Sequence, residues 1–461
     1  MFSPAELEKK LSELIDVHGV PGAQLSVLDG DQLTEVAAGV LSQRTGCPSR
    51  PDALFLPGSI GKLYTATLVM MLVEEGKLDL DVPIRTYLPD FEVRDPHARE
   101  TVTARQLLSH TSGFDGDHFT DTGRGDDALA RYVDGCSDLP QIVAPGKIWS
   151  YSNSGYAVLG RVVEVLSGLT FEEALRERLF VPLALASTVS FADEAIVHPV
   201  AVGHVPDPED PSRLVVSPAW GLHRAFGPMG TAVVASAGDV LRFVGLHLSG
   251  GLAPDGSRLL DAALVEAMRV PQIELVDDTI LGEAWGLGWI LDHWGDVAVI
   301  GHDGNSLGQN AFMRVAPAEQ FGFCLQTNVE SALTLYRELA DWLFGQRLGV
   351  TPRRDPEVRE DPMTDTERYV GTYSRVGLDI DVHLDDAQQL VATVTPSHGI
   401  AEEQGWPPMV DLPLQPVDRE DSFLLRLPIA DADLLAVFFN PDEVGGRPTY
   451  LHYGGRAHRR G

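Results

Sequence analysis

Residues 54–66 read LFLPGSIGKLYTA and place a serine, Ser59, and a lysine, Lys62, inside an apolar run. The run continues as LVMMLV, so it predicts a long buried helix that Ser59 opens and that ends near Gly76. Residues three apart lie on one face of a helix, so the lysine amine can reach the serine hydroxyl.

A buried amine next to a serine suits nucleophilic chemistry. Serine is a poor nucleophile unless a base takes its proton, and desolvation lowers the pKa of an amine so that it can act as that base. Arginine cannot do so, and of the 35 lysines and arginines only five are lysines: Lys9, Lys10, Lys62, Lys77 and Lys147. On its own, the short S-x-x-K motif favours the alternative, an ordinary helix start with a lysine that reaches for water.

Two further motifs carry polar groups that suit the same chemistry. The stretch IWSYSNSGY, residues 148–156, places Tyr151 and Asn153 two apart, where on a loop or strand they point to one side. The stretch VIGHDGNSLG, residues 299–308, places His302 and Gly304 at a strand end, and its glycines permit close approach of a substrate backbone. A second H-x-G, residues 293–295, falls in an expected hairpin turn over residues 292–296 and is set aside.

Composition narrows the partners and the compartment. The 461 residues carry a formal charge of −32, which repels nucleic acid and anionic membranes, so we expect neither as a partner. The first 20 residues mix acids and lysines at helical spacing, so we expect no secretory signal, and no apolar run reaches the ~18 residues of a membrane span. A cytoplasmic location follows as the expectation.

Metal, cofactor and disulfide chemistry are not expected. Cys47, Cys136 and Cys324 lie far apart in the sequence and form no C-x-x-C pair. The remaining histidines that we considered show no metal-ligand spacing and are expected to be structural: His110, His118, His204 and His223.

The order of elements predicts an α+β domain followed by a small β-domain. Helices are expected over residues 4–18, 152–168, 236–250 and 332–349, a hairpin over 22–40 and strands over 311–328, so that one sheet joins both ends of this region. The polar stretch 113–128 is expected to be a surface loop. We expect a catalytic domain over residues 1–350, a proline- and charge-rich linker over 351–365, and an antiparallel β-barrel or sandwich over 366–461.

The three motifs, in this order, resemble those of the serine-reactive penicillin-binding proteins and class C β-lactamases. The stretches LLSHTSGF, residues 107–114, and SAGDVLRF, residues 236–243, also look like this family. The resemblance covers roughly residues 5–348 and implies a β-lactamase/transpeptidase-like fold, an antiparallel sheet flanked by helices.

The resemblance also implies roles for the motif residues. Ser59 would be the nucleophile and Lys62 its base, and Tyr151 would shuttle protons. Asn153 would orient a substrate amide, and His302 would take the place of the lysine of the third motif. The backbone N–H groups of Ser59 and Asn305, beside Gly304, would form the oxyanion hole.

Within the family, the chain looks most like the penicillin-binding-protein-type thioesterases, which cyclise non-ribosomal peptides. Motif spacing, the stretch FTDTGRGDDAL (119–129) and a lipocalin-like C-terminal domain ending in HYGGRAHRR (452–460) carry this likeness. It implies a peptidyl-Ser59 ester, made from a thioester on a peptidyl carrier protein, with a D-residue at the acyl end. Release would be by head-to-tail macrocyclisation or by hydrolysis.

Two residues are expected to bind the substrate. Arg456 lies in the arginine-rich C-terminal end, and Gly230 in AFGPMGTA, residues 225–232, would be a bare wall that reads chirality. The alternative for Gly230 is that both glycines of this stretch merely serve a turn.

Alternatives to a cyclase remain. The chain could be a D-amino-acid-specific peptidase or esterase, or a β-lactamase-like or catalytically silent binding protein. Docking of an acidic carrier would need a local basic patch, for which the candidates are Arg353, Arg354, Arg456, Arg459 and Arg460, unless these belong to a solvated linker and tail.

Overall fold

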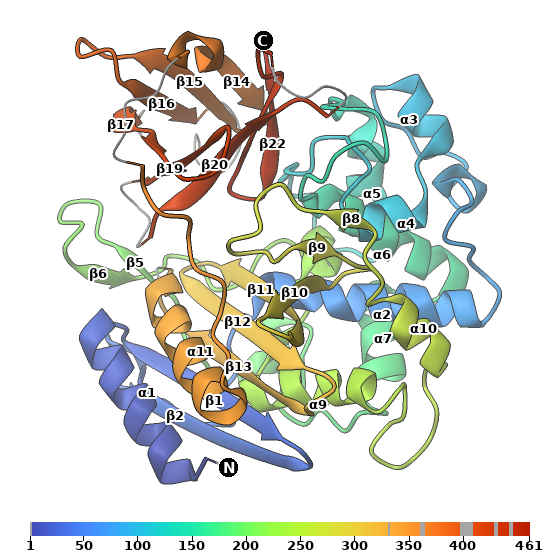
Figure 1. The fold of residues 1–461 in the computed structure, drawn as a ribbon. Helices are drawn as coiled ribbons and strands as arrows, with labels where there is room; N and C mark the ends of the chain where they lie inside the picture. The colour runs from blue at the N-terminus through green and yellow to red at the C-terminus, as the bar shows by residue number, and fades with distance from the viewer. Residues whose placement is uncertain (1, 331, 360–364, 397–408, 428–431, 442–445) are drawn as a thin grey trace.

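A nine-stranded antiparallel sheet joins the two ends of the first 350 residues (Figure 1). The structure is a computed structural model, and it describes residues 2–461 except 331, 360–364, 397–408, 428–431 and 442–445. Strand β1 (Gly22–Asp29) pairs with β2 (Gln32–Ser42) on one side and with β13 (Phe321–Thr327) on the other. This pairing confirms the predicted hairpin and the predicted meeting of distant segments in one sheet.

The sheet has the order β3-β2-β1-β13-β12-β11-β10-β9-β8. Its other strands are β3 (Cys47–Pro48), β8 (Ile273–Glu274), β9 (Ala284–Trp285), β10 (Ile290–Trp294), β11 (Val297–Ser306) and β12 (Gln309–Ala316). Trp294 pairs with Val297, so the turn between β10 and β11 contains only residues 295–296 and is narrower than the expected 292–296. The two strands therefore pair closer to the turn than expected, and within β10 the indole N–H of Trp294 donates to Asp292 Oδ2 at 2.7 Å.

Helices cover both faces of this sheet. Helices α1 (Pro4–His18) and α11 (Leu333–Leu348) pack on one face, against residues such as Leu25 and Phe323. Helices α2 (Gly61–Glu74), α6 (Asn153–Ser167) and α9 (Ala237–Leu248) lie on the other, where Met313 and Cys324 join the larger core cluster. Alternate residues of β12 and β13 therefore serve two separate cores, as the period of a strand requires.

The helices α1 and α6 have capping residues at their ends. Ser3 and Glu6 form a capping box at the start of α1, and Gly19 closes it in a left-handed conformation. Gly168 closes α6 in the same way. The shorter elements of this region are α3 (Pro96–Thr101), α4 (Ala104–Leu108), α5 (Ala128–Asp134), α7 (Phe171–Leu175), α8 (Ala192–Ala195), α10 (Ala262–Ala267), η5 (Arg224–Met229), β4 (Thr188–Val189), β5 (His204–Pro206), β6 (Leu214–Val216) and β7 (Val234–Ala235).

Ser59 does not open α2 directly. It lies in a 3-10 turn, η1 (Gly58–Ile60), and α2 begins at Gly61. Every residue of α2 from Gly61 to Leu72 is buried, because the helix is apolar on all sides. The turn thus presents the serine at the end of a fully enclosed helix.

The C-terminal residues form a second nine-stranded antiparallel sheet, which curls into a nearly closed barrel (Figure 1). Its order is β17-β16-β15-β14-β22-β21-β20-β19-β18, so the first strand of the domain pairs with the last. The strands are β14 (Gly371–Arg375), β15 (Leu378–Leu384), β16 (Leu390–Pro396), β17 (Met409–Pro413), β18 (Gln415–Pro416), β19 (Ser422–Leu425), β20 (Leu434–Phe439), β21 (Tyr450–Tyr453) and β22 (Arg456–Arg460). The predicted α+β domain with an antiparallel β-barrel domain is confirmed; β17 and β18 were not predicted.

The segment between the two sheets is held by ion pairs. Arg353 bonds Asp278 at 2.9 Å, and Arg419 of the C-terminal sheet bonds the same carboxylate at 2.7 Å. Residues 360–364 of the predicted linker lie outside the described residues, and the boundaries at 350 and 365 stay a prediction.

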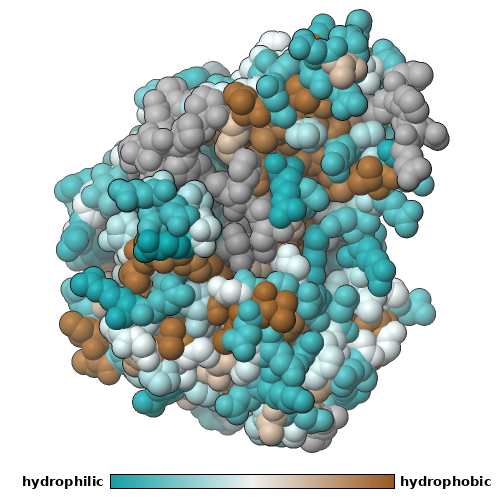
Figure 2. All heavy atoms as spheres, turned by 90° about the vertical axis from the view of Figure 1, so that its left-hand side faces the viewer, coloured by the Kyte–Doolittle hydropathy of each residue, from teal (hydrophilic) through white to brown (hydrophobic). Residues whose placement is uncertain are grey.

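Polar residues cover most of the face shown in Figure 2, with small separate apolar patches between them. This distribution agrees with the strongly acidic composition. Among the described helices, none combines the length and apolar character that crossing a membrane requires.

Two helical glycines give a test of how tightly the larger core is packed. A Cβ on Gly160 of α6 would lie 2.1 Å from Cγ of Pro228, whereas a Cβ on Gly245 of α9 would meet no atom within 4 Å. We expect Gly160→Ala to lower the free energy of unfolding by about 1–3 kcal/mol, because it overpacks the α6–η5 contact. Gly245→Ala, the matched control, should be neutral or stabilising by up to about 1 kcal/mol through helix propensity. Chemical denaturation of both variants measures this, and equal effects would show that α6 and η5 do not pack as described.

Candidate active site

The amine of Lys62 lies at the centre of the site, where three elements meet. Lys62 Nζ is 3.0 Å from Ser59 Oγ and 2.7 Å from Asn153 Oδ1, and it also donates to the backbone carbonyl of Met229 in η5. The lysine side chain is fully buried. The structure therefore brings together the first and second motifs, which lie 91 residues apart in the sequence.

Burial makes this amine a base. Removal from water lowers the pKa of Lys62 well below its usual range, the positive charge of Arg456 lowers it further, and the negative charge of Asp117 opposes the shift. A lowered pKa increases the neutral fraction of the amine, and the neutral amine can accept the hydroxyl proton of Ser59 across the 3.0 Å contact.

Tyr151 lies beside the serine and the lysine, in the loop that leads into α6. Its ring is 4.9 Å from Lys62 Nζ and 4.7 Å from the guanidinium of Arg456. Burial raises the pKa of the phenol above its usual range, and the nearby Ser59 hydroxyl opposes this. The raised pKa keeps the phenol protonated, and its oxygen, which has no hydrogen bond of good geometry to a described residue, is free to relay a proton.

The second motif is a helix start rather than a loop or strand. Ser152 is the N-cap of α6, its hydroxyl accepts the N–H of Gly155, and Asn153 is the first helical residue. Tyr151 and Asn153 still face one site, because the cap turns the chain between them. The Ser152 N–H donates to Nδ1 of His110, whose ring stacks on Tyr151 at 4.2 Å.

His302 is a neutral hydrogen-bonding group. Its Nδ1 lies 2.6 Å from the carbonyl oxygen of Asp303, which can only accept, so Nδ1 carries the proton. Burial, and then the charge of Lys62, lowers the pKa of His302 to about 3. Its Nε2 is buried without a described partner and can accept a hydrogen bond. A neutral imidazole cannot supply the charge of the lysine that it was expected to replace.

Two glycines let the main chains of η1 and β11 touch. A Cβ on Gly304 would lie 2.8 Å from Ser59 N, and a Cβ on Gly58 would lie 2.8 Å from Asn305 N. Only glycine fits at these two close approaches. The backbone nitrogens of Ser59 and Asn305 thus both lie at this contact between η1 and β11, and their role as an oxyanion hole stays a prediction.

Gly230 has a different place from the one expected. Its φ is +126°, and a Cβ there would lie 2.2 Å from the Gly58 carbonyl oxygen and 3.0 Å from Ser59 Cα. A leucine at this position would clash with the backbone segment that carries the nucleophile. Gly227 faces Ala232 and Phe171 inside the core. Chirality reading at Gly230 stays a prediction.

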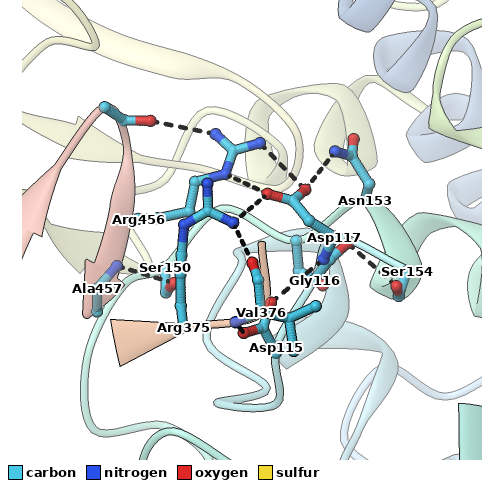
Figure 3. Close-up of polar contacts among 12 residues, drawn as sticks. Asp115, Gly116, Asp117, Ser150, Asn153, Ser154, Arg375, Val376, Arg456 and Ala457 are labelled. Atoms are coloured by element: carbon cyan, nitrogen blue, oxygen red, sulfur yellow. Dashed lines mark hydrogen bonds and ion pairs between the residues drawn. The ribbon is translucent and has the colours of Figure 1, made fainter. Parts of the chain in front are cut away.

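Arg456 reaches the site from the C-terminal domain, as Figure 3 shows. Its Nε lies 3.0 Å from Oδ2 of Asp117, and its ring contact with Tyr151 places the guanidinium over the phenol. The hairpin that carries it also touches the Tyr151 loop: Tyr151 N–H donates to the Gly455 carbonyl at 2.9 Å, and Ala457 N–H donates to Ser150 Oγ at 3.1 Å.

Asp117 is a polar residue of the site that the sequence analysis did not predict. Its carboxylate accepts Nδ2–H of Asn153 at 2.8 Å and the guanidinium groups of Arg375 and Arg456 (Figure 3). Burial alone would raise its pKa, but Arg456 and Arg375 outweigh this and hold it well below the usual range. The stretch 113–128 is thus only partly a surface loop: residues 113–116 are buried, since Phe114 joins the core of the catalytic domain and Asp115 accepts the N–H of Val376 from the C-terminal domain.

The other candidates lie away from this centre. His293 of the second H-x-G is exposed on β10, and its Nδ1 faces Glu283. His204 bridges Asn328 O and the N–H of Gln43, which is a structural role. The described residues contain no group of His, Cys, Asp and Glu that could hold a metal ion. Of the five arginines considered as a basic patch, Arg353, Arg456 and Arg460 are engaged within the chain, whereas Arg354 and Arg459 are exposed.

Replacing the base tests the role of Lys62. We expect Lys62→Arg to slow acylation of Ser59 by on the order of 100- to 10,000-fold, because arginine keeps the charge but cannot accept the proton. Lys77→Arg, the same change at an exposed lysine, should leave the rate unchanged. Stopped-flow acylation measurements check this, and a near-normal rate in Lys62→Arg would reduce the lysine to a fixed charge.

Buried neutral histidines make the fold sensitive to acid. Burial lowers the pKa of His247, His302 and His452 to about 3, below the ordinary 6.5. The unfolded chain then binds more protons, so their contribution is complete above pH 6.5 and is lost as the pH falls toward 3.

His452 offers a variant for this effect, because neither of its ring nitrogens has a described partner. Between pH 6.5 and 5, we expect His452→Phe to lose about 2 kcal/mol less stability than the parent. Chemical denaturation at both pH values measures this difference, with the exposed His97→Phe as control. Parallel slopes for parent and His452→Phe would contradict it.

The comparisons with known proteins agree with this geometry. The Beta-lactamase family model matches residues 7–344. Penicillin-binding protein 4 of Amycolatopsis lactamdurans is 43% identical over 387 residues, which are 82% of this chain and 99% of that protein. Esterase EstB of Burkholderia gladioli is 29% identical and matches 59% of this chain and 75% of the esterase.

Solved structures extend the likeness to the C-terminal domain. The crystal structure of SurE superposes with a TM-score of 0.78 at 29% identity and covers 99% of each chain. The octameric penicillin-binding protein homologue from Pyrococcus abyssi has a TM-score of 0.65 at 22% identity and shows the same fold over 99% of this chain and 100% of that chain. The family match over most of the chain, together with the Ser59–Lys62 pair at its centre, shows that the protein belongs to the beta-lactamase family of serine hydrolases, which includes the penicillin-binding proteins.

Proposed function

We propose that this serine hydrolase transfers a peptidyl group from a thioester to Ser59 and then releases it, mainly by closing the peptide into a ring. The observation that carries the proposal is the buried Lys62 amine, hydrogen-bonded at 3.0 Å to the Ser59 hydroxyl. The resemblance to penicillin-binding-protein-type thioesterases supplies the substrate class, and the peptidyl carrier protein is its proposed source.

In the first step, Ser59 Oγ attacks the thioester carbonyl while its proton passes to Lys62 Nζ. The N–H groups of Ser59 and Asn305 stabilise the negative charge that develops on the carbonyl oxygen. The C–S bond breaks, and the thiolate leaves with a proton relayed through Lys62 and Tyr151. The product is a peptidyl ester on Ser59.

In the second step, the free amino group at the other end of the peptide attacks the ester. The amine loses its proton to Lys62, the C–O bond to Ser59 breaks, and Ser59 regains a proton. Holding the amine beside the ester gives this attack the advantage of an intramolecular reaction. Water in place of the amine gives the linear acid by the same path.

A D-residue at the acyl end is part of the proposal. The SurE structure, similar over 99% of this chain at 30% identity, was also solved with D-Leu. Here the backbone of Gly230 packs against Gly58 and Ser59, next to the hydroxyl that would carry the acyl group, and we assign the reading of chirality to this stretch. Arg456 has N–H groups beyond those bound to Asp117 and Gly454, and we assign them to a peptide carbonyl oxygen.

A hydrolytic esterase or peptidase is the second candidate. Its support is the 29% identity with Esterase EstB over 59% of this chain. The two candidates share the acyl-enzyme and differ only in which nucleophile releases it.

Intact mass spectrometry with a panel of peptidyl N-acetylcysteamine thioesters tests the proposal. We expect Ser59 to gain the peptidyl mass, D-terminated substrates to react faster than L-terminated ones, and the released product to be 18 Da lighter than the linear acid, because ring closure loses one water. Ser59→Ala is the control that should gain no mass. Linear acid as the sole product would favour the esterase, and failure of every thioester to acylate Ser59 would refute acyl transfer from thioesters.

A further inference from the structure

We propose that Asp117 is a positioning residue: it fixes the amide of Asn153, and through it the amine of Lys62, and it ties both to the C-terminal domain. The inference rests on the acyl-transfer function proposed above and is independent of the peptide's identity. The residues concerned are in direct contact with one another in the structure.

The geometry of the Asn153 amide is the first step. An ionised carboxylate only accepts hydrogen bonds, so the amide end that faces Asp117 Oδ1 at 2.8 Å must be the NH₂ group. The opposite end, Oδ1, is then the only one that can face Lys62, and it does so at 2.7 Å. Asp117 therefore decides which way the amide points.

The orientation matters for the base. If the amide were turned over, its NH₂ group would face Lys62 Nζ, and two donors would meet in a buried space. The lysine would lose its 2.7 Å acceptor and its fixed position 3.0 Å from Ser59 Oγ. A misplaced base slows proton transfer from the serine.

The C-terminal domain holds Asp117 from the other side. Arg456 contributes Nε at 3.0 Å and a terminal nitrogen at 3.3 Å, and Arg375 contributes a terminal nitrogen at 3.0 Å. All three groups have low exposure: the exposed fractions are 10% for the Asp117 side chain, 16% for Arg375 and 23% for Arg456. A chain of contacts thus runs from β14 and β22 through Asp117 to Asn153 (Figure 3), and from Asn153 to Lys62.

A neighbouring acid provides a matched control. Asp115 also reaches the C-terminal domain, where it accepts the N–H of Val376 at 2.6 Å. Its other oxygen accepts the backbone N–H of Asp117 at 3.4 Å, and no described hydrogen bond joins its side chain to Asn153. Asp115 and Asp117 therefore both hold the domain interface, but only Asp117 also contacts the catalytic amide. Comparing the loss of the carboxylate at position 117 with the loss at position 115 therefore separates the positioning of Asn153 from the stability of the domain interface.

The charge of Asp117 gives a readout that a purely structural clamp would not change. Its negative charge raises the pKa of Lys62, in opposition to burial and to Arg456. Removing that charge lowers the pKa of Lys62. The rise of the Ser59 acylation rate with pH, which is the acidic limb of the pH–rate profile, must then move to lower pH even as the maximal rate falls.

The experiment compares the parent, Asp117→Asn and Asp115→Asn by the rate of Ser59 acylation with a D-terminated peptidyl N-acetylcysteamine thioester from pH 5 to 9, with thermal unfolding measured in parallel. For Asp117→Asn we expect a loss on the order of 10- to 100-fold and an acidic limb at lower pH. For Asp115→Asn we expect an acylation rate near that of the parent and an acidic limb at the same pH as in the parent.

Asp117→Asn leaves two buried arginines without their counter-ion, so Asp117→Asn/Arg375→Gln is the second variant and should show the same slower rate and shifted limb. The inference would be overturned if both Asp117 variants had the acylation rate and the acidic limb of the parent. It would also be overturned if Asp115→Asn and Asp117→Asn lost equal rate in proportion to their loss of thermal stability. A parent that never acylates would overturn the proposed function, and this inference with it.

Discussion

The burial of the Lys62 amine is the constraint on which the rest of the structure depends. Helix α2 is apolar on every side, so its packing in the core removes the amine from water. The amine then needs acceptors, and they come from three separate elements: the Ser59 hydroxyl, the Asn153 amide at the start of α6, and the Met229 carbonyl of η5. The same packing that stabilises the domain therefore assembles the site and lowers the pKa of its base.

The sequence predicted those parts of the molecule whose signals are local. The apolar runs and the three short motifs were enough for the helices, the central sheet and the Ser59–Lys62 pair. Asp117 could not be found in this way, because its partners Arg375 and Arg456 lie 258 and 339 residues further along the chain. A polar, glycine-rich stretch has the composition of a surface loop whether or not another domain later covers it.

The site also differs from its sequence-based expectation in where its positive charge lies. His302 was expected to stand in for a lysine, but burial keeps the imidazole neutral and leaves Nε2 as an acceptor. The cation next to Tyr151 is instead Arg456, 4.7 Å from the ring, and it comes from the other domain. Its charge lowers the pKa of Lys62, whereas Asp117 limits that effect. Burial is the largest cause of the lowered pKa of Lys62, and the two opposed charges adjust it.

The C-terminal domain is therefore bound to the catalytic loop rather than merely adjacent to it. The loop that carries Tyr151 satisfies its backbone through the β21–β22 hairpin, since Tyr151 N–H donates to Gly455 O and Ser150 Oγ accepts the N–H of Ala457. Buried backbone groups that lose such partners are costly, so moving the hairpin away would expose or strand them. Any displacement of the β-domain must then either carry Tyr151 with it or break these bonds. The first outcome takes the phenol away from Ser59, and the second leaves polar groups of the Tyr151 loop without partners, so the conformation of the site and the position of the second domain are coupled.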